Sequence, residues 1–287
     1  TVTGEETTPP QLVRLVRDLL ALTSVPVAGG TDMYFCELNR TRPRARDMDG
    51  IFWSLNPQVH AFDDVSLLET AEAQGEQVRA AREFAPGKAL FVGPVTLKRR
   101  YNVNATVAEE AAAGELPDSV DPRQPTLIGA AWTLASAKHL AEQGASAITY
   151  FETVGWRGVV QGDDRPPVPN RFPARAGDAF PLFHVLADIA ELRSCALLEC
   201  ATTRPLEVAA LAAIRGGGAM TLLVANLTPG AQAVELPGLD GEPRIRRLNE
   251  DTAERAMLEP QQFRAGADCA AVAALTLAPY ETVRIDS

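Results

Sequence analysis

Four short apolar segments recur within the first 151 residues, and none of them alternates between apolar and polar residues. They are VPVAGG (25–30), DGIFWSLN (49–56), KALFVGPVTL (88–97) and ASAITYF (145–151). Continuous apolar runs are typical of strands buried on both faces of a parallel sheet. This feature constrains the fold strongly, because parallel strands need long crossover connections, which are usually helices.

Segments with helical character lie before, between and after these strands. In the first of them, Leu12, Leu15, Val16, Leu19 and Leu20 recur at helical spacing and give one apolar face. The strand–helix alternation predicts a series of βα units and therefore an α/β fold. The expected helices cover residues 8–22, 63–85, 123–144 and 178–192.

The sequence pattern changes after residue 193. Segments 220–238, 244–249 and 274–287 are typical of strands separated by turns, and no helix is expected among them. We therefore predict two domains, a βα-type domain over 1–193 and an antiparallel β-sandwich over 194–287.

Composition argues against several classes of function. The net charge of −10 disfavours a nucleic-acid partner, because binding phosphates needs a basic surface. No apolar run approaches the roughly 20 residues that cross a bilayer, so no membrane partner is expected. We expect a cytoplasmic protein.

Cysteine and histidine are too sparse to indicate a metal site. The four cysteines form no CxxC pair, and only three histidines are present. We expect no metal and no organic cofactor, and we expect the thiols to be free and buried in a reducing environment. These residues are Cys36, Cys195, Cys200, Cys269, His60, His139 and His184.

Polar side chains follow each of the four predicted strands. The carboxyl ends of parallel strands lie at the same edge of a sheet, where α/β proteins place their functional groups. We therefore predict that these side chains share a cleft. The candidates are Asp32 and Glu37 after the first strand, Asn56 and His60 after the second, Lys98 after the third, and Glu152 and Trp156 after the fourth.

Each candidate also has a purely structural interpretation. Glu152 could pair with Arg157 or Lys98, and Glu37 could pair with the arginine-rich loop that follows it. The others could be a turn former (Asp32), a turn cap (Asn56), a structural histidine (His60), a surface lysine (Lys98) and a core aromatic (Trp156). No nucleotide-binding, serine-hydrolase or zinc-protease motif is present to decide between them.

Four segments around these candidates together resemble the D-apionate lactonase family. They are GGTDMYFCELNRTRP (29–43), SLNPQVHAFDD (54–64), GPVTLKRRYN (93–102) and YFETVGWRG (150–158). The resemblance implies the second half of a glycoside-hydrolase-like (β/α)8 TIM barrel followed by a β-sandwich ending in LAPYETVRI. It also implies an enzyme that opens a five-membered sugar lactone.

The resemblance raises two further expectations. A TIM barrel has eight strands, and four would leave open sheet edges, so we expect either a longer protein with an N-terminal half-barrel or closure by a second copy. Retaining glycosidases of this fold carry carboxylates on their fourth and seventh strands. Here the strand corresponding to the seventh ends in Lys98, and the fourth is absent.

Three functions fit these residues. The leading hypothesis is a sugar-lactone hydrolase in which Glu152 and Glu37 act as base and acid, in either order. The substrate-binding residues would be Asp32, Asn56, His60, Lys98 and Trp156. The alternatives are a glycoside hydrolase with two carboxylates and a non-catalytic carbohydrate-binding module. In each case the partner is a small sugar or sugar lactone.

Overall fold

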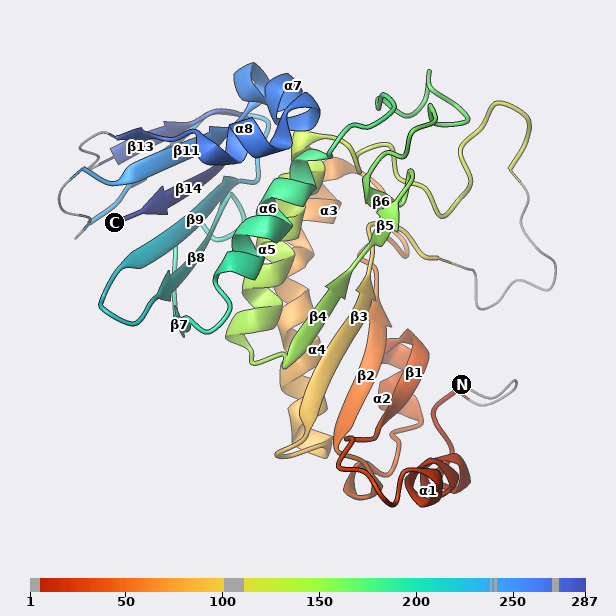
Figure 1. Ribbon diagram of the computed structural model, residues 1–287. Helices are drawn as coiled ribbons and strands as arrows, with labels where there is room; N and C mark the ends of the chain where they lie inside the picture. The colour runs from red at the N-terminus through yellow and green to blue at the C-terminus, as the bar shows by residue number, and fades with distance from the viewer. Residues whose placement is uncertain (1–5, 101–110, 238, 240–241, 270–273) are drawn as a thin grey trace.

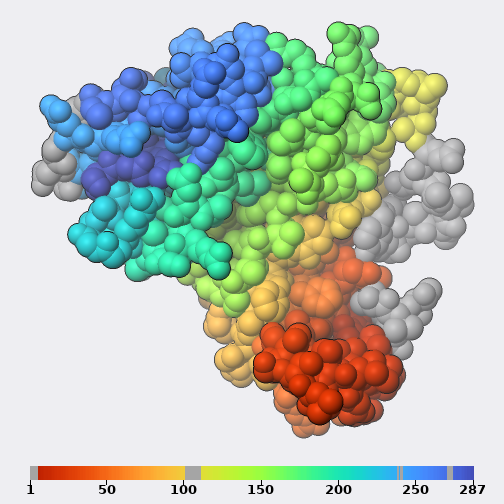
Figure 2. Space-filling view, in the orientation of Figure 1, coloured from red at the N-terminus to blue at the C-terminus, as the bar shows by residue number. Residues whose placement is uncertain are grey.

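A layer of helices separates two β structures (Figure 1). The computed structural model describes residues 6–100, 111–237, 239, 242–269 and 274–287. Figure 2 shows the red and orange N-terminal part and the blue C-terminal part on opposite sides of the green helical region. Tyr101 and Asn102, which end one of the four family-like segments, lie outside the described residues.

The first β structure is a parallel sheet with the strand order β1-β2-β3-β4. Its helix-covered face buries Ile51, Trp53, Leu90 and Val92 in one cluster with Val78 of the neighbouring helix. The predicted parallel sheet is confirmed. The strands are β1 (Ala28–Tyr34), β2 (Gly50–Leu55), β3 (Ala89–Val95) and β4 (Ala147–Tyr150).

The four expected helices are present on this side, with two differences, whereas the helix Phe35–Arg40 and the short helical turn Ala45–Asp47 were not predicted. The expected helix 63–85 is divided at Thr70 into α3 and α4, and Asp63 caps α3 by accepting from the backbone N–H of Ser66 at 2.9 Å. In α1, Leu15 and Leu19 are 54% and 76% exposed, so its apolar face is only partly covered. The elements are α1 (Pro10–Leu19), α2 (Phe35–Arg40), the short η1 (Ala45–Asp47), α3 (Asp64–Glu69), α4 (Ala71–Phe84), α5 (Leu127–Glu142) and α6 (Pro181–Glu191).

Helix α5 lies at the centre of the molecule and is buried on nearly every side. Eleven of its sixteen residues are buried. It packs against α4 and α6 and also against two strands of the C-terminal part, β8 (Val208–Ile214) and β9 (Met220–Asn226). A helix that is apolar all round needs partners all round, and the two β structures and their helices provide them.

The C-terminal part consists of a six-stranded and a two-stranded antiparallel sheet, as expected for a sandwich. The larger sheet has the order β12 (Asp268–Cys269), β11 (Arg244–Leu248), β14 (Thr282–Asp286), β9 (Met220–Asn226), β8 (Val208–Ile214) and β7 (Ala196–Leu198). The smaller pairs β10 (Gln232–Glu235) with β13 (Ala274–Leu277). A separate parallel pair, β5 (Glu152–Val154) and β6 (Gly158–Val160), follows β4.

The expectation that no helix follows residue 193 is wrong. Helices α7 (Glu250–Leu258) and α8 (Pro260–Ala265) connect β11 to β12. Asn249 and Thr252 form a capping box at the start of α7, and the two helices bury Ala256, Met257 and Phe263.

Strand β8 joins the two parts of the chain because both of its faces are buried. Ala209, Leu211 and Ala213 belong to the core that includes α5 and the parallel sheet, whereas Val208, Ala210 and Ala212 belong to the core between the two C-terminal sheets. One apolar core therefore extends from the parallel sheet into the sandwich. The domain boundary at 193/194 stays a prediction.

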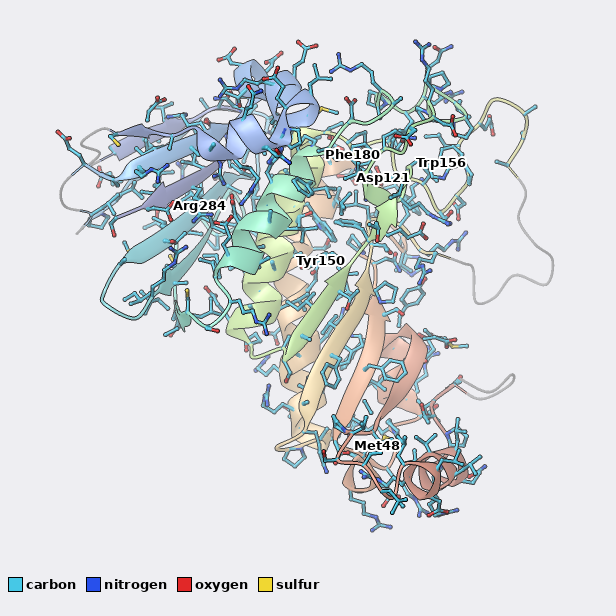
Figure 3. All side chains as sticks on the ribbon, in the orientation of Figure 1. Met48, Asp121, Tyr150, Trp156, Phe180 and Arg284 are labelled. Atoms are coloured by element: carbon cyan, nitrogen blue, oxygen red, sulfur yellow. The ribbon has the colours of Figure 1, made fainter. Side chains whose placement is uncertain are left out.

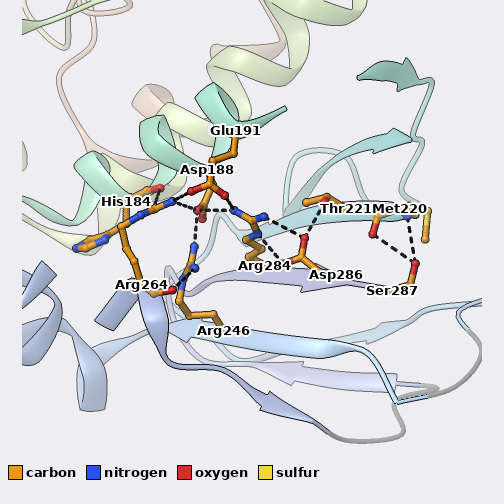
Figure 4. A network of polar contacts seen from close by, with 10 residues as sticks. All are labelled: His184, Asp188, Glu191, Met220, Thr221, Arg246, Arg264, Arg284, Asp286 and Ser287. Carbon is orange, nitrogen blue, oxygen red and sulfur yellow. Dashed lines mark hydrogen bonds and ion pairs between the residues drawn. The ribbon is translucent and has the colours of Figure 1, made fainter. Parts of the chain in front are cut away.

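Ion pairs reinforce the contact between α6 and the sandwich (Figure 4). Asp188 on α6 pairs with Arg264 at 2.9 Å, with Arg284 at 3.1 Å and with Arg246. Arg284 also pairs with Glu191. The guanidinium groups thus hold two carboxylates of α6 against the larger sheet.

All four cysteines are free, but the expectation that they are buried is wrong for Cys36 and Cys269, which are exposed. Cys195 and Cys200 are half-buried. Among the helices that the structure describes, none combines the length and apolar character needed to span a bilayer.

Candidate active site

Three adjoining pockets lie at the carboxyl ends of β1 to β4. The largest, about 500 Å³, shares Tyr34 and Ser54 with a pocket of about 140 Å³ and shares Lys98 with one of about 10 Å³. The two smaller pockets share Thr96 and Arg100. We call the three together the strand-end groove. Its polar lining includes Glu37, Asn56 and Lys98 in the largest pocket, Asp32, Thr96 and Arg100 in the second, and Glu152, Asp121 and Arg157 in the third.

Figure 3 shows the two ends of the sheet. Asp121 and Trp156 lie beyond the carboxyl ends of β3 and β4, whereas Met48 lies at the opposite end. The strand-end groove therefore lies at the end of the sheet where parallel α/β proteins place their chemistry.

Glu37 lies in the first turn of α2 and lines the largest pocket. Its Oε2 accepts a hydrogen bond from the backbone N–H of Tyr34 at 3.2 Å, which completes a capping box. Its Oε1 is 3.9 Å from Arg40. The ion pair with the arginine-rich loop is thus present, but its distance is long. Among the described residues, Oε1 of Glu37 has no closer ion-pair partner than Arg40.

Asn56 directly follows β2 and lines the same pocket. Its Oδ1 and Nδ2 atoms are both buried, and in the described part of the chain neither has a hydrogen-bond partner. An unsatisfied buried polar group costs about 1–3 kcal/mol. This amide therefore has hydrogen-bonding capacity that no described residue uses.

Lys98 lies where the largest and the smallest pockets meet. It is half-buried, and its ammonium group forms no ion pair or hydrogen bond with the residues that the structure describes. The hydroxyl of Thr96 donates to the carbonyl of Lys98 at 2.7 Å and fixes the backbone at this point. Among the described residues, the groove therefore contains a cation that no carboxylate pairs with.

Glu152 begins β5 and lines the smallest pocket. Its Oε1 is 3.1 Å from Arg157 and 3.8 Å from Arg100. The pairing with Arg157 was one of the structural interpretations of this residue, and Arg100 is its second partner instead of Lys98. Two guanidinium groups thus hold this carboxylate at the end of the groove.

The other three candidates have different positions. Asp32 has an exposed side chain that lines the 140 Å³ pocket. His60 is exposed and lines none of the three pockets. Trp156 is half-buried, packs against the main core and also lines none of them. The sheet therefore brings five of the seven candidates to one groove, and the role of each stays a prediction.

A buried polar network beside the groove was not predicted. Gln58 donates to Asp121 at 2.6 Å, and Asp121 accepts from Arg123 at 2.7 Å. Burial by itself would raise the pKa of Asp121, but the hydrogen bonds from Arg123 and Gln58 outweigh burial and lower it. Asp121 and Arg123 lie just before a helix in the sequence, where polar residues are common, so no local signal distinguishes them.

A metal centre is not indicated by the described side chains. Within this part of the chain, no group of three or more His, Cys, Asp or Glu residues is arranged to hold a metal ion.

The fold defines a class of protein, those that combine a TIM-barrel-type domain with a C-terminal β domain. The GH51 arabinofuranosidase from Xanthomonas axonopodis pv. citri superimposes with a TM-score of 0.59 and 13% identity, over 97% of this chain and 63% of that one. A 4-O-alpha-L-rhamnosyl-beta-D-glucuronidase from Fusarium oxysporum 12S superimposes with a TM-score of 0.60 and 14% identity, over 97% of this chain and 63% of that one. At these identities the likeness establishes the fold alone.

Within this class, the chain belongs to the D-apionate lactonase family. Residues 4–194 match the family's TIM barrel domain, and residues 205–285 match its C-terminal immunoglobulin-like domain. The chain is 28% identical over 194 residues to the D-apionate lactonase of Brucella anthropi, which is 67% of this chain and 31% of that protein. It therefore spans about a third of the length of this relative. The resemblance seen in the sequence is confirmed.

Proposed function

We propose that the protein is a hydrolase that opens a five-membered sugar lactone of the D-apionolactone type. Membership of the D-apionate lactonase family supports the class of reaction. The observation that carries the proposal is the composition of the largest pocket, where Glu37 lies with the amide of Asn56 and the ammonium of Lys98, and neither of these two groups has a partner among the described residues.

Lactone hydrolysis needs a base and a group that stabilises negative charge. A base removes a proton from water as the water oxygen attacks the carbonyl carbon, and a cation or donor stabilises the resulting oxyanion. The ring C–O bond then breaks, and the leaving ring oxygen takes up the proton that the base removed from water, which gives a hydroxy acid. In our proposal Glu37 is the base, Lys98 stabilises the oxyanion and Asn56 binds a hydroxyl group of the sugar. No cofactor is required.

Accessibility favours Glu37 over Glu152 as the base. Glu37 lines about 500 Å³ of space, and Oε1 has only the long contact with Arg40. Glu152 lines about 10 Å³, and its Oε1 is engaged by Arg157 and Arg100. We therefore assign Glu152 to holding these arginines at the end of the groove and Asp32 to binding substrate in the second pocket. The proposal does not use His60 or Trp156.

The experiment is a comparison of Glu37→Gln and Lys98→Met with the wild-type protein, with proton release from D-apionolactone as the readout. Gln can still accept from the N–H of Tyr34, so the fold should be retained. We expect kcat to fall about 100-fold or more in each variant, because general bases and oxyanion-stabilising groups contribute on this scale. Glu76→Gln, on the exposed face of α4, is the matched control and should keep full activity. A Glu37→Gln protein that hydrolyses the lactone at the wild-type rate would exclude Glu37 as the base.

A glycoside hydrolase is the second candidate, and the presence of Glu37 and Glu152 in adjoining pockets favours it. Such an enzyme would use both carboxylates around an oxocarbenium-like transition state. Turnover of aryl glycosides without turnover of lactones would support this function. A non-catalytic binding module would instead give thermal protection by the sugar, no turnover of either substrate, and tolerance of both glutamate substitutions.

A further inference from the structure

Residues 118–124 (DSVDPRQ) run along the carboxyl ends of three strands, just before α5. We call this segment the loop clamp. Its side chains bind the connections that follow β2, β3 and β4, which are far apart in the sequence. These connections carry Asn56, Lys98 and Glu152 of the strand-end groove.

Arg123 of the loop clamp holds the connection after β2. Its Nη2 donates to Oε1 of Gln58 at 2.6 Å, and its Nη1 donates to Oδ1 of Asp64 at 2.9 Å and to the carbonyl of Phe62 at 3.2 Å. One guanidinium group therefore fixes three points of the loop between Asn56 and α3.

Asp121 and Asp118 hold the connection after β3. Oδ2 of Asp121 accepts from Nε2 of Gln58 at 2.6 Å, and the same Nε2 atom is 2.7 Å from the carbonyl of Leu97. Asp118 accepts from Nε of Arg99 at 2.7 Å. Lys98 lies between Leu97 and Arg99, so the clamp fixes the residues on both sides of this cation.

Ser119 and Gln124 hold the connection after β4. The hydroxyl of Ser119 accepts from Nη1 of Arg157 at 3.2 Å, and Nε2 of Gln124 donates to the carbonyl of Gly158 at 2.8 Å. Arg157 is also the closest ion-pair partner of Glu152 in the described part of the chain. The position of this carboxylate therefore depends on the same segment.

Asp121, at the centre of the loop clamp, has no free acceptor position with which to take part in a reaction. The side chain of Asp121 is 1% exposed, and its two oxygens accept from the backbone N–H, Nε and Nη2 of Arg123 and from Nε2 of Gln58. A carboxylate with all its acceptor positions occupied has no lone pair free for a proton. Asp121 can act on a reaction only through the groups that it positions.

We propose that Asp121 is a positioning residue that sets the placement of Lys98 through Gln58 and Leu97 and ties the three strand-end loops into one rigid site. The inference rests on the proposed function. Buried polar networks in which every member is satisfied make a local structure rigid, and small displacements of catalytic groups lower rates strongly. The clamp thus accounts for how loops from three strands can place groups accurately around one substrate.

The test compares Asp121→Asn with Asp188→Asn. The first substitution replaces an accepting oxygen with an amide N–H that faces groups which are themselves donors, so the clamp should loosen. Asp188 is the matched control, because it is another buried aspartate that accepts from arginines, but it lies between α6 and the sandwich. Both changes should lower Tm. Below both unfolding transitions, we expect Asp121→Asn to lower kcat about 10- to 100-fold with a smaller change in KM, and Asp188→Asn to keep the wild-type kcat.

Amide hydrogen exchange tests the clamp without relying on turnover. Asp121→Asn should speed exchange in residues 58–64, 97–99 and 156–158, and Asp188→Asn should not. Unchanged exchange in these loops, or equal effects of the two substitutions on kcat, would overturn the inference. If the wild-type protein does not hydrolyse the lactone, the proposed function fails, while the exchange comparison still decides whether the clamp holds the loops.

Gln58→Leu provides a second variant if Asp121→Asn does not fold. It removes the bridge from Asp121 to Leu97 and leaves the contacts between Asp121 and Arg123 in place. The same loss of kcat is expected, and a wild-type kcat in this variant would contradict the proposed connection to Lys98.

Discussion

At the scale of single residues, His184 is a buried imidazole whose surroundings determine its protonation state. It lies on α6, and its Nε2 is 3.0 Å from the carbonyl of Ala256, while Nδ1 has no partner among the described residues. Burial lowers the pKa of His184 to about 4, and the nearby Arg264 and Arg246 act in the same direction against the Ala256 carbonyl and Asp188. The ring is therefore neutral near pH 7 and donates from Nε2–H.

This ring should make folding stability depend on pH. The pKa in the folded protein, about 4, is below the ordinary value of 6.5, so the unfolded chain binds a proton first as the pH falls. The contribution of His184 to the free energy of unfolding is therefore fully present above pH 6.5. About 2–3 kcal/mol of it is lost as the pH falls towards 4. Urea unfolding of wild type and His184→Gln between pH 7.5 and 4.5 measures this contribution, and the variant should show the flatter dependence. The exposed His60→Gln is the control, and identical slopes for all three proteins would contradict the assignment.

At the scale of elements, the contact between β1 and β2 depends on a residue without a side chain. Gly30 pairs with Phe52 in the parallel register, and a Cβ atom at Gly30 would lie 1.9 Å from the Phe52 carbonyl oxygen. The two strands can approach each other this closely only because that atom is absent. Glu37 and Asn56 follow these strands, so the groove depends on the same contact.

Gly30→Ala should therefore be strongly destabilising. The two backbones would have to separate, and we expect a loss of more than about 3 kcal/mol, which is in the range of severe steric substitutions. Denaturant unfolding measures it. Gly216→Ala is the control, because a Cβ there would have no atom within 4 Å. Comparable stabilities of the two variants would show that β1 and β2 can separate at little cost.

How far the sequence predicts the elements depends on how distinct their patterns are. Strands β2, β3 and β4 are apolar runs and were located to within a few residues, whereas β1 (Ala28–Tyr34) begins and ends later than the expected segment 25–30. Strand β8 was not recognised, because VAALAAI is dominated by alanine, which has no strand preference. Helices α7 and α8 were missed because they are short, and their buried positions make sense only against α6 and the sandwich.

Some residues of the candidate site could likewise be predicted from the sequence, and others could not. Glu37, Asn56, Lys98 and Glu152 could be placed from their position after strands, since the sheet fixes where strand ends lie, whereas Asp32 lies inside β1, which continues to Tyr34. The loop clamp could not, because Gln58 and Arg123 are 65 residues apart and meet only in the folded chain. Sequence patterns predict which edge of a sheet is functional, whereas the contacts that make the edge rigid are tertiary.

At the scale of the whole molecule, the two parts of the chain should unfold together. Their apolar residues form one core through α5 and β8, and the ion pairs of Asp188 cross the same contact. We expect a single cooperative transition.

Two local probes can test this expectation. The three tryptophans, Trp53, Trp132 and Trp156, all report on the N-terminal part, and a fluorophore on the exposed Cys269, in a Cys36→Ser background, reports on the sandwich. Their denaturation curves should coincide. A sandwich that unfolds at lower denaturant than the tryptophan environment would show two independent domains.

Helix α5 has a wider consequence for how this chain can change in evolution. Because it is enclosed by neighbours on nearly every side, a substitution that suits the barrel-like layer must also be accommodated by the immunoglobulin-like layer. The two modules therefore cannot diverge independently or be exchanged freely with those of other proteins. Lineages of this family are expected to inherit them as a pair, with compensating changes on the two sides of one shared helix.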